Sequence, residues 1–215
     1  MERKITALKA QKRNPDRINV YLEGEFAFGL SRIVAAWLHV GQMLSDEKIK
    51  QLQEEDVAEV AFQRALRFLA HRPRSEHEME QKLQMVGFEP NVIRAVIERL
   101  KNSGYLDDQQ FSKLWVENRN DYRPRSRRVL AMELRQKGVA EEIIQHTLSE
   151  NLDEEVLAYR AASRYARRLE GLDWETFHTR LSGFLARRGF GYGTISSVVR
   201  RAWKEVNPTG NHLEN

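Results

Sequence analysis

The chain has 215 residues, of which 41% are hydrophobic and 31% are charged, and its formal net charge is +4. Apolar residues recur along almost its whole length, which excludes low-complexity disorder, and the absence of cysteine excludes disulfides, thiolate metal sites and cysteine nucleophiles. No apolar run approaches the ~18 residues of a membrane helix and the N-terminal segment lacks a secretory apolar core, so we expect a cytoplasmic protein with no membrane partner.

The first part of the chain is predicted to form a small antiparallel β element. Residues 5–11, 18–22 and 26–30 have strand patterns, with turn signals at residues 14–16 and 23–25. A short helix over residues 33–40 should end at Gly41, and Ser45 should cap a charged helix that runs to about residue 55. Residues 1–57 are therefore predicted to form an N-terminal region of strands and short helices.

From about residue 58 the pattern is helical and repeats at an interval of 51 residues. The sequence Arg-Pro-Arg-Ser at residues 72–75, called here the RPRS motif, recurs at residues 123–126. Two shifts of this interval also align a leucine and a glycine of all three copies: Leu83, Leu134 and Leu185, and Gly87, Gly138 and Gly189. Each copy is predicted to be one three-helix unit.

The first helices of the units are predicted at residues 60–70, 111–120 and 156–168. The second helix of the first copy should begin at Ser75, because Glu78 three residues later completes a capping box. Its apolar stripe should end at Gly87, where a left-handed residue stops the helix and Phe88 packs back against it. That stripe is predicted to contain Met79, Leu83 and Val86, and the third helix should bury Ile93, Val96, Ile97 and Leu100.

Stacked units of this kind bury a continuous core that one unit alone cannot form. The predicted fold is therefore mainly α, with three tandem three-helix repeats in an elongated curved array and a small N-terminal antiparallel β element. The predicted domains are residues 1–57 for the β element and short helices, 58–106, 107–154 and 155–205 for the three repeats, and 206–215 for a flexible tail.

The sequence offers no convergent catalytic constellation. Its six histidines include no i, i+4 pair of the kind that binds metal on a helix. The glycines of residues 189–193 lack the spacing of a phosphate loop, and Asp107 with Gln110 is explained as a helix cap. The four tryptophans are scattered and are expected in the core. We therefore predict a binding protein that is not an enzyme and has no cofactor.

The arginines of the RPRS motif have no evident structural task, because proline and serine suffice to start the helix. Guanidinium groups contact phosphates or carboxylates, and a helix N-terminus beside them favours anions; ion pairs on the protein's own surface are the alternative. The predicted partner-binding residues are Arg72, Arg74, Arg123, Arg125, Arg127, Arg128, Arg135, Lys137, Arg180, Arg187 and Arg188.

Together these stretches resemble the RecX family of bacterial recombinase regulators. The matching residues are Ala-Leu-Arg-Phe-Leu at 65–69, the first RPRS motif, Glu78, Lys82-Leu83, Gly87-Phe88, the stretch from Arg99-Leu100 through Gly-Tyr-Leu-Asp-Asp at 104–108, Arg-Pro-Arg-Ser-Arg-Arg at 123–128 and Leu-Arg-Gln-Lys-Gly-Val at 134–139. The resemblance is densest over residues 58–148 and extends to about residue 204. The third copy departs from it, with Trp174 in place of Arg123 and Phe177 in place of Ser126.

The resemblance implies a protein that binds the RecA filament on single-stranded DNA, in the filament's helical groove. We expect a monomer that contacts single-stranded DNA directly or through the filament. It would inhibit filament extension, ATP hydrolysis, strand exchange and coprotease activity, and so modulate recombination, DNA repair and the SOS response. The alternative is a helix-turn-helix module that acts on naked DNA, with its turn at Gly138 and Val139. Against this alternative, the would-be recognition helix begins with the carboxylates of Glu141 and Glu142.

Overall fold

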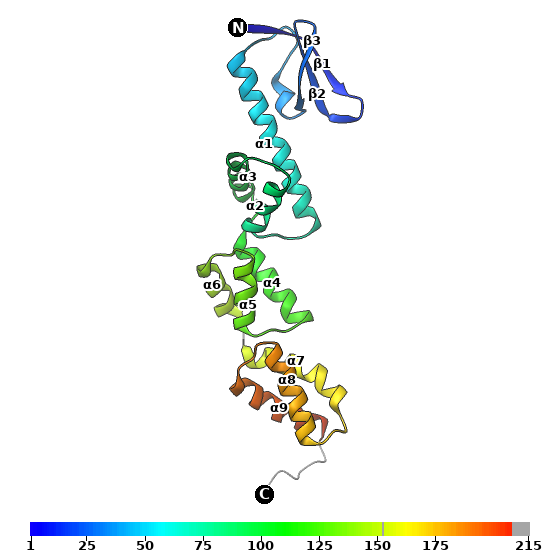
Figure 1. Ribbon diagram of the computed structural model, residues 1–215, viewed down its shortest axis with the longest axis vertical. Helices are drawn as coiled ribbons and strands as arrows, with labels where there is room; N and C mark the ends of the chain where they lie inside the picture. Colours follow the sequence, from blue (N-terminus) through cyan, green and yellow to red (C-terminus); the bar gives the residue numbers. More distant parts are fainter. Residues whose placement is uncertain (152, 208–215) are drawn as a thin grey trace. The chain divides into compact units, whose positions relative to one another are not determined.

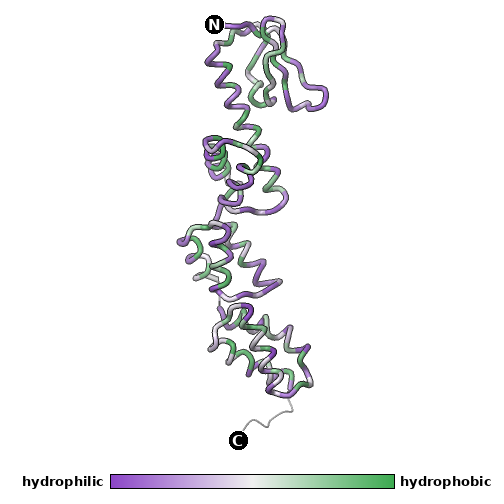
Figure 2. Tube along the Cα trace, in the orientation of Figure 1, coloured by the Kyte–Doolittle hydropathy of each residue, from purple (hydrophilic) through white to green (hydrophobic). Residues whose placement is uncertain are grey.

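The computed structural model describes residues 1–151 and 153–207. It divides into two compact units, Met1–Leu106 and Asp107–Asn215 (Figure 1). Hydrophobic and hydrophilic residues alternate along the helices of both units (Figure 2). In the described part of the chain, no helix is long and apolar enough to span a bilayer. The predicted tail at residues 206–215 falls outside the described residues, except for Val206 and Asn207.

The first unit begins with an antiparallel sheet, as predicted. Its strands β1 (Glu2–Gln11), β2 (Asn14–Leu22), β3 (Glu25–Ser31) and β4 (Met43–Ser45) lie in the order β3-β2-β1-β4. Glu23 and Gly24 form the turn between β2 and β3, with φ of 49° and 91°. The turn predicted at residues 14–16 is wrong, because those residues start β2, where the missing N–H of Pro15 is tolerated at a strand end.

The helix predicted over residues 33–40 is only a 3-10 turn, η1 (Val34–Trp37). Trp37 is 89% exposed, so the expectation that this tryptophan lies in the core is wrong. The core of the sheet is instead closed by aliphatic residues of the strands and by the next helix. These residues include Ile5, Val20, Leu30, Leu44, Ile49 and Leu52.

One helix, α1 (Asp46–His71), replaces the two that were predicted on either side of residues 55–60. It begins at Ser45, whose side chain accepts a hydrogen bond from the amide of Lys48. Residues 56–59 contain no helix breaker, and their two carboxylates are buried against partners from elsewhere in the unit. The helix therefore continues from the sheet into the first repeat, through the boundary predicted at residues 57 and 58.

The first repeat is completed by α2 (Glu76–Met85) and α3 (Pro90–Asn102). Ser75 caps α2 by accepting a hydrogen bond from the amide of Glu78 at 3.2 Å. At the other end Gly87 has a φ of 90°, and the amide of Phe88 returns to the carbonyl of Leu83 at 3.3 Å. Val86 is 43% exposed, contrary to prediction, because it follows the last residue of α2 and has left the helical stripe.

The second unit contains the other two repeats, each with three helices as predicted. Leu134 and Leu185 are fully buried, like Leu83 in the first repeat, and a left-handed glycine ends the second helix of each copy. The helices are α4 (Asp108–Tyr122), α5 (Arg127–Gln136), α6 (Glu141–Asn151), α7 (Glu154–Ala166), α8 (Trp174–Arg187) and α9 (Tyr192–Val206), with the 3-10 turn η2 (Arg167–Leu169).

The third repeat replaces the RPRS motif with a different helix start. Helix α8 begins after Asp173, whose carboxylate accepts a hydrogen bond from the amide of Thr176 at 2.9 Å. Phe177, at the position of the cap Ser126, is instead a fully buried core residue, and its ring lies 5.0 Å from that of Trp203. The change therefore lengthens α8 at its start and fills the core with an aromatic ring.

Candidate partner-binding surface

The two arginines of the first RPRS motif interact within their own repeat. The guanidinium of Arg72 donates two hydrogen bonds to the carboxylate of Glu78, at 2.8 and 3.1 Å, and this contact raises the pKa of Arg72. Arg74 donates to the carbonyl of Phe68 at 3.3 Å and lies over its ring. Burial, followed by the charge of Arg72, lowers the pKa of Arg74.

The second RPRS motif stands in a different charge environment. Val129 occupies the position equivalent to Glu78, and Arg127 and Arg128 follow the cap Ser126. The first turn of α5 therefore has no acidic residue, whereas that of α2 has two. Positive charges at a helix N-terminus oppose the helix dipole, so this arrangement does not favour the helix itself.

Arg188, at the end of α8, joins the second motif from the third repeat. The amide of Ser126 donates to the carbonyl of Arg188 at 3.1 Å, and the Arg188 guanidinium donates to the carbonyl of Pro124 at 3.0 Å. The same guanidinium lies over the ring of Phe184, 4.4 Å from its centroid. These contacts hold Arg188 beside the second RPRS motif.

We call Arg123, Arg125 and Arg188 the junction cluster. Burial, then the charges of Arg125 and Arg123, lower the pKa of Arg188, so the guanidinium groups of Arg123 and Arg125 both lie within electrostatic reach of that of Arg188. The Nε atom of Arg125 is buried and has no hydrogen-bond partner. Across residues 1–151 and 153–207, no carboxylate forms an ion pair with any member of the cluster. The cluster is thus a local excess of positive charge.

Two other predicted residues are engaged inside the second repeat. Arg135 pairs with Glu141 at 2.7 Å, and this contact, with a hydrogen bond from Gln145, lowers the pKa of Glu141 to about 2. The ammonium of Lys137 lies 5.0 Å from the centre of the Trp115 ring. The remaining candidates are exposed arginines of α5 and α8, namely Arg127, Arg128, Arg180 and Arg187.

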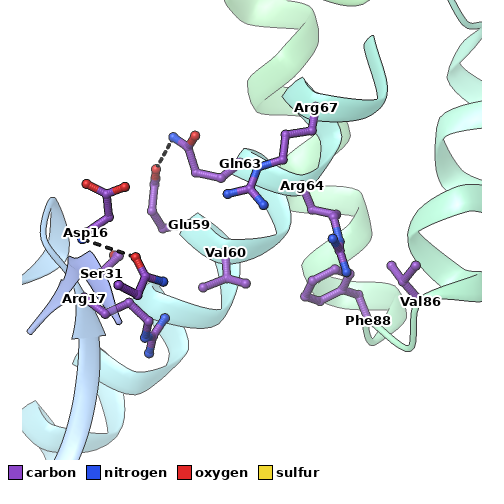
Figure 3. Close-up of a pocket in the computed structure, with 11 residues that line it drawn as sticks. Asp16, Arg17, Ser31, Glu59, Val60, Gln63, Arg64, Arg67, Val86 and Phe88 are labelled. Atoms are coloured by element: carbon purple, nitrogen blue, oxygen red, sulfur yellow. Dashed lines mark hydrogen bonds between the residues drawn. The ribbon is translucent and has the colours of Figure 1, made fainter. Parts of the chain in front are cut away.

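A groove of about 360 Å³ in the first unit was not predicted (Figure 3). It lies between the sheet, α1 and the loop after α2, and Arg64 lies beside Phe88 in it. Three sequence-distant segments build it and share no motif, so no signal in the sequence pointed to it. Its lining residues are Asn14, Asp16, Arg17, Ser31, Glu59, Val60, Gln63, Arg64, Arg67, Val86 and Phe88.

The groove mixes charges of both signs, and two of its charged residues already have partners. Arg17 pairs with Asp56 at 2.8 Å, and Glu59 pairs with Arg99 at 2.7 Å. Over the described ranges, no group of three or more histidine, aspartate or glutamate side chains is placed to hold a metal ion. The junction cluster therefore remains the stronger candidate for binding an anionic partner.

Comparison with known proteins supports a family assignment over most of the chain. Four family models match: the Regulatory protein RecX N-terminal domain at residues 3–45, and the first, second and third RecX three-helix domains at residues 61–100, 107–148 and 153–199. Each of the three helical matches falls on one of the repeats described above.

Individual relatives agree with the domain matches. The Regulatory protein RecX of Bacillus subtilis (strain 168) is 32% identical over 199 residues, which are 91% of this chain and 75% of that protein. That of Clostridium perfringens (strain SM101 / Type A) is 30% identical over 204 residues, covering 92% and 95%.

Solved structures share the fold. A crystal structure of regulatory protein RecX superposes with a TM-score of 0.74 at 23% identity, covering 91% of this chain and 98% of that one. That of RecX from Lactobacillus salivarius gives 0.61 at 19% identity, covering 69% and 97%. With its sheet and all three helical repeats matched in order, the chain belongs to the RecX family of regulatory proteins.

Proposed function

We propose that this protein binds the RecA filament on single-stranded DNA, in the filament's groove, and inhibits filament extension, ATP hydrolysis, strand exchange and coprotease activity. By this route it modulates recombination, DNA repair and the SOS response in the cytoplasm, as a monomer without enzymatic activity. The observation that carries the proposal is the junction cluster, whose positive charge lacks a carboxylate partner in the described part of a RecX-family chain.

In this proposal the predicted residues contribute unequally to the surface that contacts the filament. The junction cluster, with the exposed Arg127, Arg128, Arg180 and Arg187, provides the main charged surface. The internal contacts of Arg72, Arg74, Arg135 and Lys137 give these residues a smaller share of the partner surface. An anionic partner that contacted this main charged surface would offset its excess positive charge. This supports a filament of protein and nucleic acid as the partner.

Helix-turn-helix binding to naked DNA is the weaker candidate. Helix α6 would be the recognition helix of the second repeat, and Glu141 and Glu142 lie in its first turn. A glutamate is ionised at physiological pH even at its ordinary pKa, so Glu141, whose pKa is lowered, has a negative charge there. A recognition helix enters the major groove with its N-terminal residues, so these charges would face phosphates and oppose binding.

The function is tested by adding the protein to RecA filaments preformed on single-stranded DNA while ATP hydrolysis is followed. We expect hydrolysis to fall as the protein approaches the filament concentration. Binding to naked single- and double-stranded DNA is titrated in parallel at several salt concentrations. Unchanged hydrolysis, with equal affinity for naked DNA and filament, would contradict the proposal and favour the helix-turn-helix alternative.

Reversing the charge of Arg125, Arg127 and Arg128 together to glutamate is expected to abolish inhibition of filament ATP hydrolysis. Like charge placed against an acidic or phosphate surface costs several kcal/mol. Helicity should remain nearly intact, because Arg127 and Arg128 are exposed and acidic side chains in the first turn of α5 favour the helix dipole. Circular dichroism and the ATPase titration measure the two effects.

The matched control is Ser126→Ala, which lies between the reversed residues but removes only the helix cap. It should lower the free energy of unfolding by about 1 kcal/mol and still inhibit at saturating protein concentration. A folded triple variant that inhibits at wild-type concentrations would show that the partner contact lies elsewhere.

A further inference from the structure

We propose that the junction cluster binds the phosphodiester backbone of single-stranded nucleic acid directly. The inference rests on the proposed function and deepens it, because it assigns one component of the filament, the DNA strand, to one group of side chains. The site is formed by Arg123 and Arg125 of the second repeat and Arg188 of the third, so it needs both repeats of the second unit.

The cluster is held together at an electrostatic cost. A hydrogen bond from the Ser126 amide to the Arg188 carbonyl, and one from the Arg188 guanidinium to the Pro124 carbonyl, bring the third repeat to the motif. Burial, and after it the resulting proximity of like charges, disfavours the protonated form of Arg188. The buried Nε of Arg125 also lacks an acceptor, and a buried donor without a partner is unfavourable. An anion would relieve both penalties.

In the first repeat, the first arginine of the same motif forms an ion pair within the repeat. There Glu78 accepts both hydrogen bonds of the Arg72 guanidinium. At the equivalent position the second repeat has Val129, which has no acceptor to offer Arg123. The first arginine of the motif is thus neutralised in the first repeat, whereas its equivalent, Arg123, has no such acid in the second, so the second copy is the one suited to an external anion.

Phosphate fits this arrangement better than a protein carboxylate. A single guanidinium can donate to both oxygens of a carboxylate, as the pairs of Arg72 with Glu78 and Arg135 with Glu141 show here. Three guanidinium groups that approach from two repeats suit an anion with more acceptor oxygens, and a strand places such anions in series.

An exposed aromatic side chain beside the cluster favours a single strand. Tyr122 directly precedes Arg123 and is 75% exposed. Proteins that bind single strands without sequence preference combine a basic track along the backbone with aromatic rings on which bases stack. Arg127 and Arg128 extend the basic track into the first turn of α5.

The test compares the full-length chain with the double variant Arg123→Gln/Arg125→Gln. Fluorescence anisotropy of a labelled oligo(dT) reports affinity at several salt concentrations, and thermal unfolding reports stability. We expect affinity to fall by about tenfold or more at moderate salt, and the slope of log K against log salt to decrease by about 1.4, or about 0.7 for each lost phosphate contact. The thermal midpoint should not fall, because the charge repulsion on Arg188 is relieved.

The control is Arg167→Gln/Arg168→Gln, which removes the same charge from two exposed arginines of η2 in the same unit. It should change oligo(dT) affinity by less than about twofold. Equal losses for the two double variants would show a diffuse electrostatic effect and overturn the inference, as would a wild-type chain that does not bind oligo(dT).

Filament assays of the same variants keep the two proposals distinguishable. If Arg123→Gln/Arg125→Gln binds oligo(dT) like the wild type but no longer inhibits filament ATP hydrolysis, the cluster meets an acidic protein surface. That result would overturn the phosphate site and leave the proposed function standing. Loss of oligo(dT) binding together with weakened inhibition is the outcome that supports both.

Discussion

Replacing Gly189 with alanine is expected to lower the free energy of unfolding of the second unit by about 2–5 kcal/mol. Gly189 has a φ of 87°, and an L-residue in that conformation costs about 1–2 kcal/mol. A Cβ there would also lie 2.3 Å from Cγ2 of Val129 and 2.6 Å from Oγ of Ser126. Such overpacking costs about 1–3 kcal/mol more, because the start of α5 must shift. Urea denaturation measures the sum.

The first repeat provides a matched control for this substitution. Gly87 occupies the equivalent position with a φ of 90°, but a Cβ there would meet nothing within 4 Å. Gly87→Ala should therefore cost only the conformational part, about 1–2 kcal/mol. The difference between the two variants isolates the close packing of the turn after α8 against the cap of α5. Equal losses would show that the two repeats do not depend on this contact.

Leu134→Ala is expected to destabilise the protein by about 2–5 kcal/mol, since truncation of a fully buried leucine loses burial and leaves a cavity. Leu134 belongs to a hydrophobic cluster that includes residues of both repeats in the second unit, among them Leu185. Leu83→Ala and Leu185→Ala should fall in the same range, because both side chains are also fully buried.

The denaturation midpoint of each leucine variant is compared with that of Val86→Ala. The Val86 side chain is 43% exposed and follows the end of α2, so its truncation should change stability by less than about 1 kcal/mol. If the leucine variants unfold at the same denaturant concentration as Val86→Ala, the three leucines do not carry the repeat cores.

The features that recur in the sequence were predictable, because each has a local cause that the 51-residue interval exposes three times. The end of each second helix is marked by a left-handed glycine and by a leucine four residues before it. The carbonyl of that leucine accepts a hydrogen bond from the amide of the residue after the glycine. The cap Ser75 and the cap Asp107 were likewise predictable from short-range spacing alone. The three-helix pattern of every repeat was therefore confirmed.

Features that depend on distant partners were missed. Asp56 and Glu59 are buried, because Arg17 from the sheet and Arg99 from α3 reach them, and no local pattern indicates these partners. This pairing also explains why two predicted helices are one. Trp37 was assigned to the core on side-chain type, although the 3-10 turn leaves it exposed.

The candidate site was predicted only in part. The excess of arginine after residue 123 was evident, but its union with Arg188 arises from packing between repeats that no spacing encodes. The position of Glu78 fits a helix cap, so the sequence pattern does not indicate that it neutralises Arg72. The two copies of one motif thus differ through a single acidic position.

The continuous helix α1 has a mechanical consequence for the first unit. A helix of 26 residues is about 39 Å long and resists bending, and here its first half packs in the core of the sheet while its second half packs in the first repeat. Two ion pairs attach the helix to its neighbours. Asp56 pairs with Arg17 of the sheet, and Glu59 pairs with Arg99 of the repeat. We therefore expect the sheet and the first repeat to move as one rigid body. A ligand that binds the sheet would then also fix the orientation of the first repeat.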